Sequence, residues 1–136
     1  SKLTKEEIAE EFEKTTKLLE EFTGKTPVLA RIPYMEASDL IHETAGFPLA
    51  HCYVDSKDYT QIPTEEIIKN IMDAEAEGNL ENSIVLLHEH YNATAGAVEY
   101  LIPALMEKGY RFVTVSELAK RHNVALEKGV LYSRLD

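Results

Sequence analysis

The sequence has few of the features that would place it in a membrane, on nucleic acid or in a disulfide-stabilised fold. Its one cysteine, Cys52, cannot form a disulfide within the chain. No apolar run approaches the roughly 18 residues of a membrane span, and no signal-peptide pattern opens the chain. Lysine and arginine number 14 against 24 acidic residues, which gives a net charge of −10. Because such a surface repels phosphate backbones, we expect no nucleic-acid partner and favour a neutral or cationic ligand.

The segments that are present alternate between helical and β-rich patterns. Apolar residues make up 44% of the 136 residues, which suits one domain or part of one. The predicted helices cover 4–23, 38–45, 64–77, 98–108 and 116–121, and the predicted strands cover 28–31, 49–54, 83–87 and 110–115. This alternation is typical of an α/β protein with a parallel sheet. Four strands are too few for a closed barrel of about eight. They could form a small open sheet, or part of a larger barrel whose beginning lies outside the chain.

The helix boundaries have clear chemical signals. Thr4 and Glu7 match a capping box, and Gly24 is expected to end the first helix. We expect its apolar stripe (Ile8, Phe12, Leu19 and Phe22) to be buried. In the central segment 83–118, a strand is followed by a loop over 92–96, a helix that ends at Gly109, and a further strand.

Polar residues recur where the predicted strands end. Arg31 follows the first strand, Asp55 and Asp58 follow the second, and His88 follows the third. Ligands bind beyond the carboxyl ends of parallel strands, so an Arg, an Asp and a His could meet in one cleft. An Asp bonded to one imidazole nitrogen would orient the ring as a competent acid. Alternatively, Arg31 and Asp58 form a structural ion pair and His88 is a satisfied loop residue.

The pair His88 and His90 is also a candidate metal site, because residues at i and i+2 of a strand face the same way. The sequence offers no evident third ligand, and strand pairing is expected to stop near His88. Of the other histidines, His42 and His122 are expected at the surface and His51 in the core or at its rim.

Three short motifs together resemble a known family. Arg31-Ile32-Pro33-Tyr34, Asp58-Tyr59 and Leu86-Leu87-His88 are similar in order and spacing to the third, fourth and fifth motifs of the polysaccharide deacetylases. This family is also known as the NodB-homology or carbohydrate esterase family 4 domain. The run Gly-Tyr-Arg-Phe-Val-Thr-Val at 109–115 strengthens the resemblance, which extends from Leu3 to about Leu118.

The resemblance implies a fold and a domain organisation. The chain would be α/β, part of a (β/α) deacetylase-type barrel with parallel strands, without the N-terminal strands. Residues 1–121 would form the C-terminal portion of the catalytic domain, and residues 122–136 a tail of uncertain order.

The resemblance also implies an activity and a set of catalytic residues. The family hydrolyses N- or O-acetyl groups of polymers such as chitin, peptidoglycan or acetylated xylan with a divalent metal, most often zinc. Carried over by position, His88 would protonate the leaving amine or alcohol and Asp58 would orient it. Arg31 would hold the aspartate that acts as base, and the backbone N–H of Tyr34 would stabilise the oxyanion.

Two further residues would bind substrate. Leu86 would line the pocket for the acetyl methyl group, and Tyr59, where the family usually has Trp, would keep an aromatic wall. The family's first and second motifs, T-F-D-D-G and H-x-x-x-H, supply the base and the metal ligands and do not occur in this sequence. We therefore expect the chain alone to hold no catalytic metal and to be inactive.

The expected partners and location follow from the same comparison. An acetylated polysaccharide is the expected substrate, and a companion chain with the missing segment, or self-association, would cover the open barrel. A secreted or cell-envelope location is implied. Two alternatives are a non-catalytic saccharide-binding or scaffold relative, and an unrelated small α/β enzyme with its own metal on His88 and His90.

Overall fold

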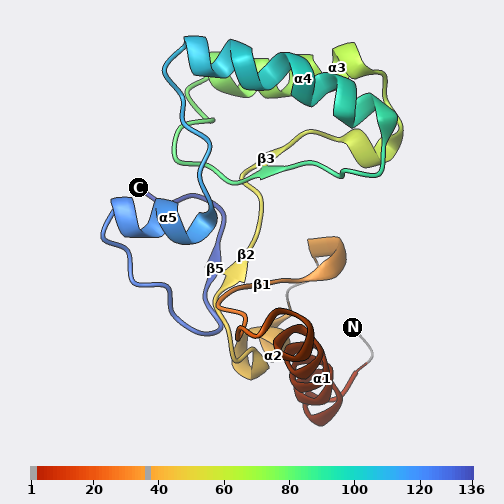
Figure 1. Cartoon of the computed structure of the whole chain (residues 1–136), viewed down its shortest axis with the longest axis vertical. Helices are drawn as coiled ribbons and strands as arrows, with labels where there is room; N and C mark the ends of the chain where they lie inside the picture. Colours follow the sequence, from red (N-terminus) through yellow and green to blue (C-terminus); the bar gives the residue numbers. More distant parts are fainter. Residues whose placement is uncertain (1–2, 36–37) are drawn as a thin grey trace. The chain divides into compact units, whose positions relative to one another are not determined.

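The protein is built from two α/β units, each with its own short parallel sheet (Figure 1). The computed structural model describes residues 3–35 and 38–136. Residues 1 and 2, which open the predicted catalytic portion, and residues 36 and 37 lie outside this description. Among the described helices, none has both the length and the apolar character needed to cross a membrane.

The first unit comprises Ser1–His51 and Val124–Tyr132. Its elements are α1 (Lys5–Thr23), β1 (Ala30–Arg31), the 3₁₀ turn η1 (Pro33–Met35), α2 (Asp39–Thr44), β2 (Leu49–Ala50) and β5 (Leu131–Tyr132). The strands pair in parallel in the order β1-β2-β5. The predicted tail of uncertain order, 122–136, therefore contains an edge strand of this sheet.

Helix α1 begins and ends where the sequence predicts. The N–H of Glu7 donates to the Thr4 hydroxyl, the N–H of Thr4 donates to the Glu7 carboxylate, and Gly24 caps the C-terminus at φ 66°. Its packing differs from the prediction. The N-terminal half contributes Ile8 to a core with α2 and β2, but Leu19 and Phe22 are 43% and 82% exposed. This core ends at Phe12, so the apolar stripe of the C-terminal half stays in solvent within the described structure.

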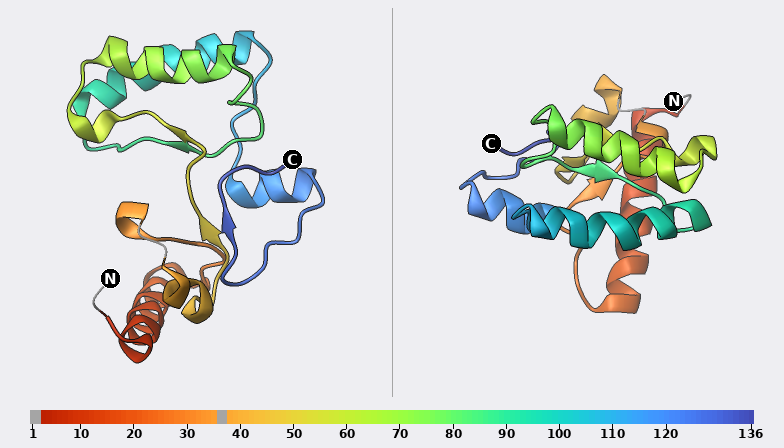
Figure 2. Two further views of the ribbon diagram at one scale, coloured as in Figure 1. Left: turned by 180° about the vertical axis from the view of Figure 1, so that it is seen from behind. Right: turned by 90° about the horizontal axis from the view of Figure 1, so that it is seen from above.

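The second unit comprises Cys52–Asn123 and Ser133–Asp136. Its elements are β3 (Val54–Asp55), the 3₁₀ turn η2 (Asp58–Thr60), α3 (Thr64–Ala76), β4 (Val85–Leu86), α4 (Asn92–Glu107) and α5 (Val115–Arg121). Helices α3 and α4 lie side by side over the β3–β4 ladder (Figures 1 and 2).

The β3–β4 register separates the face that packs on α3 and α4 from the opposite face. Val54 pairs with Val85, and both pack in the cluster formed by α3 and α4 around Ile67 and Leu101. Because neighbouring residues of a strand point to opposite faces, Asp55 and Leu86, the other pair in register, face away from these helices. His88 follows Leu86 by two residues. Leu87, between them, packs against the cluster of α3 and α4.

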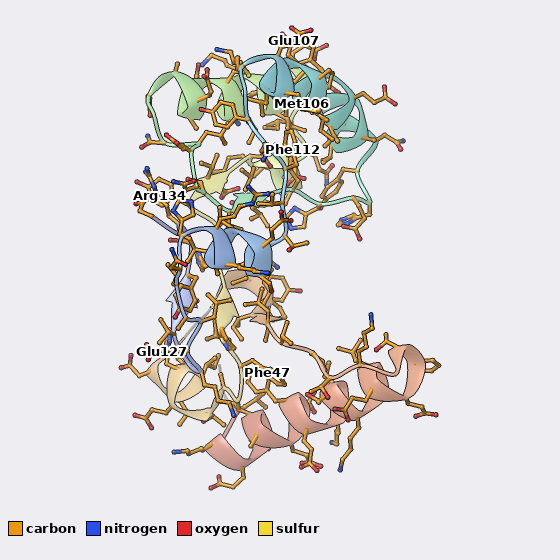
Figure 3. All side chains as sticks on the ribbon, turned by 60° about the vertical axis from the view of Figure 1, so that its left-hand side comes forward. Phe47, Met106, Glu107, Phe112, Glu127 and Arg134 are labelled. Carbon is orange, nitrogen blue, oxygen red and sulfur yellow. The ribbon has the colours of Figure 1, made fainter. Side chains whose placement is uncertain are left out.

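Two predicted strands differ from the structure. The predicted strand 49–54 is divided between β2 and β3, because the N–H of His51 donates to Tyr132 whereas the N–H of Tyr53 donates to Ile84. The segment 110–115 is not a strand. Among the described residues, no backbone hydrogen bond joins 111–113 to a neighbouring strand, and Phe112 projects from this connection with 56% of its surface exposed (Figure 3).

Candidate active site

A buried carboxylate and a half-exposed imidazole form the centre of the candidate site. Asp58, directly after β3, is 1% exposed, and His88 follows β4. Asp58 Oδ1 lies 2.7 Å from His88 Nδ1. Because an ionised carboxylate can only accept, Nδ1 carries the hydrogen. Asp58 Oδ2 accepts from the backbone N–H of His88 at 2.5 Å and from the Thr94 hydroxyl at 2.8 Å. The carboxylate is thus held by three donors.

These donors keep Asp58 ionised despite its burial. Burial is the largest single influence and raises the pKa of the carboxyl group. The hydrogen bonds from the His88 side chain, the His88 backbone and Thr94 together outweigh it, so the pKa of Asp58 lies below its ordinary value. Thr94 belongs to the first turn of α4, whose positively polarised end also favours a negative charge. A charged acceptor therefore faces His88 at neutral pH.

The loop 55–61 adopts a conformation that few sequences favour. Lys57 and Gln61 flank η2 with φ values of 63° and 59°, in the left-handed region that non-glycine residues rarely adopt. The N–H of Asp58 donates to the Ser56 hydroxyl at 3.3 Å, and Asn70 of α3 donates to the Ser56 carbonyl at 2.9 Å. Helix α3 thus fixes the loop from which Asp58 points to His88.

Asp55, the other acid at this strand end, has a structural role. Its carboxylate accepts from Lys57 Nζ at 2.6 Å, from the Lys57 N–H at 3.0 Å and from the Tyr59 hydroxyl at 3.1 Å. Burial raises the pKa of Asp55, but these hydrogen bonds outweigh it and leave the pKa lowered. Asp55 therefore holds Tyr59 in place and has no contact of its own with His88 among the contacts described.

Aromatic rings surround the open side of His88. The Tyr59 ring lies edge-on at 5.8 Å between centroids, and Tyr91 and His90 approach at 6.1 and 5.8 Å. The His88 side chain is 27% exposed. Since Nδ1 faces Asp58, Nε2 lies on the opposite edge of the ring, where a ligand could reach it. Leu86, the last residue of β4, is buried, and Tyr59 is partly exposed.

Arg31 and Tyr34, the other predicted site residues, belong to the first unit. Arg31 ends β1 with an exposed side chain, and in the described part of the chain it forms no ion pair. Tyr34 lies in η1 with φ 57° and ψ 10°, and its side chain is 90% exposed. Left-handed conformations in aromatic residues are strained and concentrate at functional sites. The structure therefore groups Asp58, His88, Leu86 and Tyr59 in one unit and holds Arg31 and Tyr34 in the other.

The described residues do not form a metal site. No group of three or more His, Cys, Asp or Glu side chains in residues 3–35 and 38–136 could hold an ion. His88 and His90 meet as an edge-to-face ring pair, and Asp58 already accepts three hydrogen bonds. Zinc sites need at least three protein ligands, so this donor set does not fit the metal that the resemblance implies. Of the other histidines, His42 is half-buried rather than exposed, with Nδ1 2.7 Å from the Gly129 carbonyl oxygen.

Thr94 is the site residue that sequence reasoning missed. The sequence predicts a loop over 92–96, whereas α4 begins at Asn92 and includes Thr94 in its first turn. A signal was present in the spacing. Thr94, Ala97, Leu101 and Leu105 recur at helical intervals, and all four are buried. A single hydroxyl on an otherwise apolar helix face needs a partner, and Asp58 supplies it.

Comparisons with known proteins support a deacetylase-type fold. No family model matches the sequence. The chain is 28% identical over 118 residues to the peptidoglycan-N-acetylglucosamine deacetylase PgdA of Listeria monocytogenes, covering 87% of this chain and 24% of that protein. It therefore spans about a quarter of the length of this curated relative.

Two solved structures extend the comparison. A T48 deacetylase with substrate superposes with a TM-score of 0.83 at 26% identity, over 97% of this chain and 63% of that one. A family 4 acetyl xylan esterase from Clostridium thermocellum, in complex with a cobalt ion, superposes with a TM-score of 0.84. At 18% identity over 99% of this chain and 66% of that one, it supports the fold alone.

Parallel strands, covering helices and an Asp–His pair beyond the strand ends define part of a (β/α) deacetylase-type barrel, as the sequence predicts, rather than a small open sheet. The chain is similar in sequence and in structure to the polysaccharide deacetylases of carbohydrate esterase family 4, and the similarity corresponds to the C-terminal part of their catalytic domain. This similarity argues against the alternative of an unrelated α/β enzyme.

Proposed function

We propose that this chain supplies the general acid of a deacetylase that hydrolyses N- or O-acetyl groups of a polysaccharide of the peptidoglycan, chitin or xylan type. One observation carries the proposal: a buried, ionised Asp58 holds Nδ1 of His88 at 2.7 Å, which leaves Nε2 of this partly exposed side chain outside the Asp58 contact. A histidine with no function at the surface gives no reason to bury a carboxylate beside it and to hold that carboxylate with three hydrogen bonds. The name of the Listeria relative supplies the peptidoglycan type, and the motif resemblance supplies chitin and xylan.

The chemistry of this half of the site is proton delivery. Water adds to the acetyl carbonyl, the bond from the acetyl carbon to the sugar nitrogen or oxygen breaks, and acetate is released. The leaving nitrogen or oxygen takes its proton from His88 Nε2, while the Nδ1–H bond to Asp58 keeps the ring oriented. Leu86 would line the pocket for the methyl group, and Tyr59 would form its aromatic wall.

Arg31 and Tyr34 would act on the first step of the reaction, the addition of water to the acetyl carbonyl. Arg31 is a free cation at a strand end in the described structure, and we infer that it pairs with the carboxylate that acts as base. The strained backbone of Tyr34 would direct its N–H at the oxyanion. A left-handed aromatic residue with an exposed ring supports a role for the backbone rather than for the side chain.

The metal ligands and the base would come from residues outside these 136. The described donors form no metal site, so we derive no step of this chain's residues through a metal. When bound in the complete domain, a divalent ion such as zinc would polarise the acetyl carbonyl. We further infer a secreted or cell-envelope location, because polymers of this class lie outside the cytoplasm.

The test is acetate release from acetylated chito-oligosaccharides, peptidoglycan and acetylxylan. We expect none from the chain alone, with or without zinc. In the complete domain, His88→Ala should lower kcat by about 10²–10⁴-fold, the usual contribution of a general acid. The matched control is His122→Ala in the same unit, which removes a histidine that makes no described side-chain contact to Asp58 or His88 and should leave kcat unchanged.

Two outcomes would contradict the proposal. Near-normal turnover of His88→Ala would exclude the acid role. A complete domain that binds the oligosaccharides but releases no acetate would identify the chain as a non-catalytic saccharide-binding relative.

A further inference from the structure

The hydroxyl of Thr94 has no role in the proton delivery described above, although it is one of the most buried polar groups in the second unit. Its residue is 2% exposed, and Oγ1 donates to Asp58 Oδ2 at 2.8 Å. Thr94 does not touch the open edge of His88. Its one described side-chain partner is the carboxylate.

The remaining donors to Asp58 both come from His88. The ring Nδ1–H reaches Oδ1 and the backbone N–H reaches Oδ2. Without Thr94, the carboxylate would be held only by the residue that it has to orient, so both could rotate together. The Thr94 hydroxyl comes from a different element, α4, and fixes the carboxylate plane independently of His88.

The position of Thr94 is itself fixed. The Thr64 hydroxyl, at the start of α3, donates to the Ala93 carbonyl at 3.1 Å and joins the first turns of the two helices. Gly96 permits this approach, since a Cβ at that position would lie 3.3 Å from the Thr64 side chain. The hydroxyl of Thr94 is therefore held against Asp58 by the packing of α3 on α4.

We propose that Thr94 is a positioning residue of the acid: its hydroxyl anchors the Asp58 carboxylate to α4 and so keeps the His88 ring in the orientation that delivers the proton. This inference rests on the proposed function, because only an acid at His88 gives the orientation a catalytic consequence. Thr94 itself does not reach substrate.

The test compares Thr94→Val, which removes the hydroxyl at similar size, with Thr94→Ser, which retains it. In the complete domain we expect Thr94→Val to lower kcat about tenfold, as for loss of one hydrogen bond to a charged group, with KM unchanged. Thr94→Ser should restore most of kcat. Thr60→Val is the matched control, since the described hydrogen bond of the Thr60 hydroxyl goes to the Lys57 carbonyl in the same loop and not to the Asp58 carboxylate.

A second readout does not depend on activity. Carbon-13 NMR of the Asp58 carboxyl group in the complete domain should show its pKa raised toward the ordinary value in Thr94→Val, because one of the hydrogen bonds that lower it is gone. Thr94→Ser and Thr60→Val should leave it low. Thr94→Ala is measured alongside, so that the result does not depend on valine fitting the site.

The outcomes separate this inference from the proposed function. If His88→Ala keeps full turnover, the acid role is wrong whatever Thr94 does. If His88→Ala is inactive while Thr94→Val and Thr94→Ala keep both kcat and the low pKa of Asp58, the positioning role is overturned. A loss of stability alone, with both readouts unchanged, would also overturn it.

Discussion

Replacing Asp58 with asparagine should destabilise the protein at neutral pH, and the difference should shrink in acid. The substitution keeps the shape of the side chain and removes its charge. An amide can present its oxygen to the His88 backbone N–H and to Thr94, and its NH₂ group then faces Nδ1, which can accept from it only when the ring hydrogen moves to Nε2. The variant therefore reverses one hydrogen bond, and all three become bonds between neutral groups.

The magnitude follows from the donors. Hydrogen bonds to charged groups stabilise by about 1.5–3 kcal/mol and neutral ones by about 0.5–1.5 kcal/mol, so each of the three contacts loses roughly 1 kcal/mol. We expect Asp58→Asn to cost up to about 3 kcal/mol at pH 7, reduced by the burial penalty of the charge, which asparagine avoids. That is a large part of the roughly 5–15 kcal/mol by which a domain is stable.

The pH dependence has a definite sign. The pKa of Asp58 in the folded protein lies below its ordinary value of 3.8, so near that pH the unfolded chain binds more protons than the folded one. The stabilisation from the charge is complete above about pH 5 and is lost as the pH falls below 3.8 and through the folded pKa. Asparagine does not titrate, so its deficit against wild type should shrink over this window.

Urea unfolding at fixed protein concentration, from pH 7 down to pH 3, measures both effects. The control is Asp73→Asn on the exposed face of α3, where the carboxylate pairs with Lys69 in solvent and should contribute less than about 0.5 kcal/mol. If Asp58→Asn costs no more than Asp73→Asn at pH 7, or if its deficit is the same in acid, Asp58 is not a buried carboxylate held by hydrogen bonds.

Two further predictions concern the fold. Gly129 has φ 73°, and a Cβ there would lie 2.2 Å from the His42 carbonyl oxygen, so Gly129→Ala should cost roughly 2–4 kcal/mol in urea unfolding. Gly24→Ala, at φ 66° with open space around it, should cost only about 1 kcal/mol, and equal costs would contradict the packing of residues 124–132 on α2. The purified chain should self-associate, because Phe112 stands exposed on an apolar groove of about 1000 Å³ in the second unit. It should bind no stoichiometric zinc, because the described donors form no metal site. Sedimentation should show less association for Phe112→Ser, and a monomer with one equivalent of zinc would refute this view.

The elements with local chemical signals were predictable from the sequence. The capping box at Thr4, the glycines at 24 and 109, and the Asp–His pair all lie where the pattern predicts. Each depends on residues close in sequence or on the rule that strand ends of one sheet share an edge. Parallel pairing also followed, since the alternation of helices and strands permits little else.

The remaining features depend on partners that a single segment does not reveal. Helix α4 begins after Tyr91, which makes no side-chain cap, so its first turn has no capping signal and Thr94 was assigned to a loop. Nothing in the sequence at 51–53 marks the change of partner that divides the predicted strand 49–54. The pattern at 110–115 is β-rich, but a strand also needs a hydrogen-bonded neighbour.

The proposed acid, His88 with Asp58, is positioned entirely by residues of the second unit. Proton delivery by His88 can therefore be tested separately from the step that involves Arg31 and Tyr34. Every described contact that fixes Asp58 and His88, from Ser56 and Asn70 to Thr94, lies within the second unit. The dyad should therefore keep its geometry whatever binds or reacts at Arg31 and Tyr34 in the first unit. A substitution at Arg31 should then lower turnover without changing the pKa of Asp58, whereas Thr94→Val should change both. The pKa of Asp58, read from its carboxyl resonance, thus distinguishes substitutions that disturb the proposed acid from substitutions that disturb the proposed base.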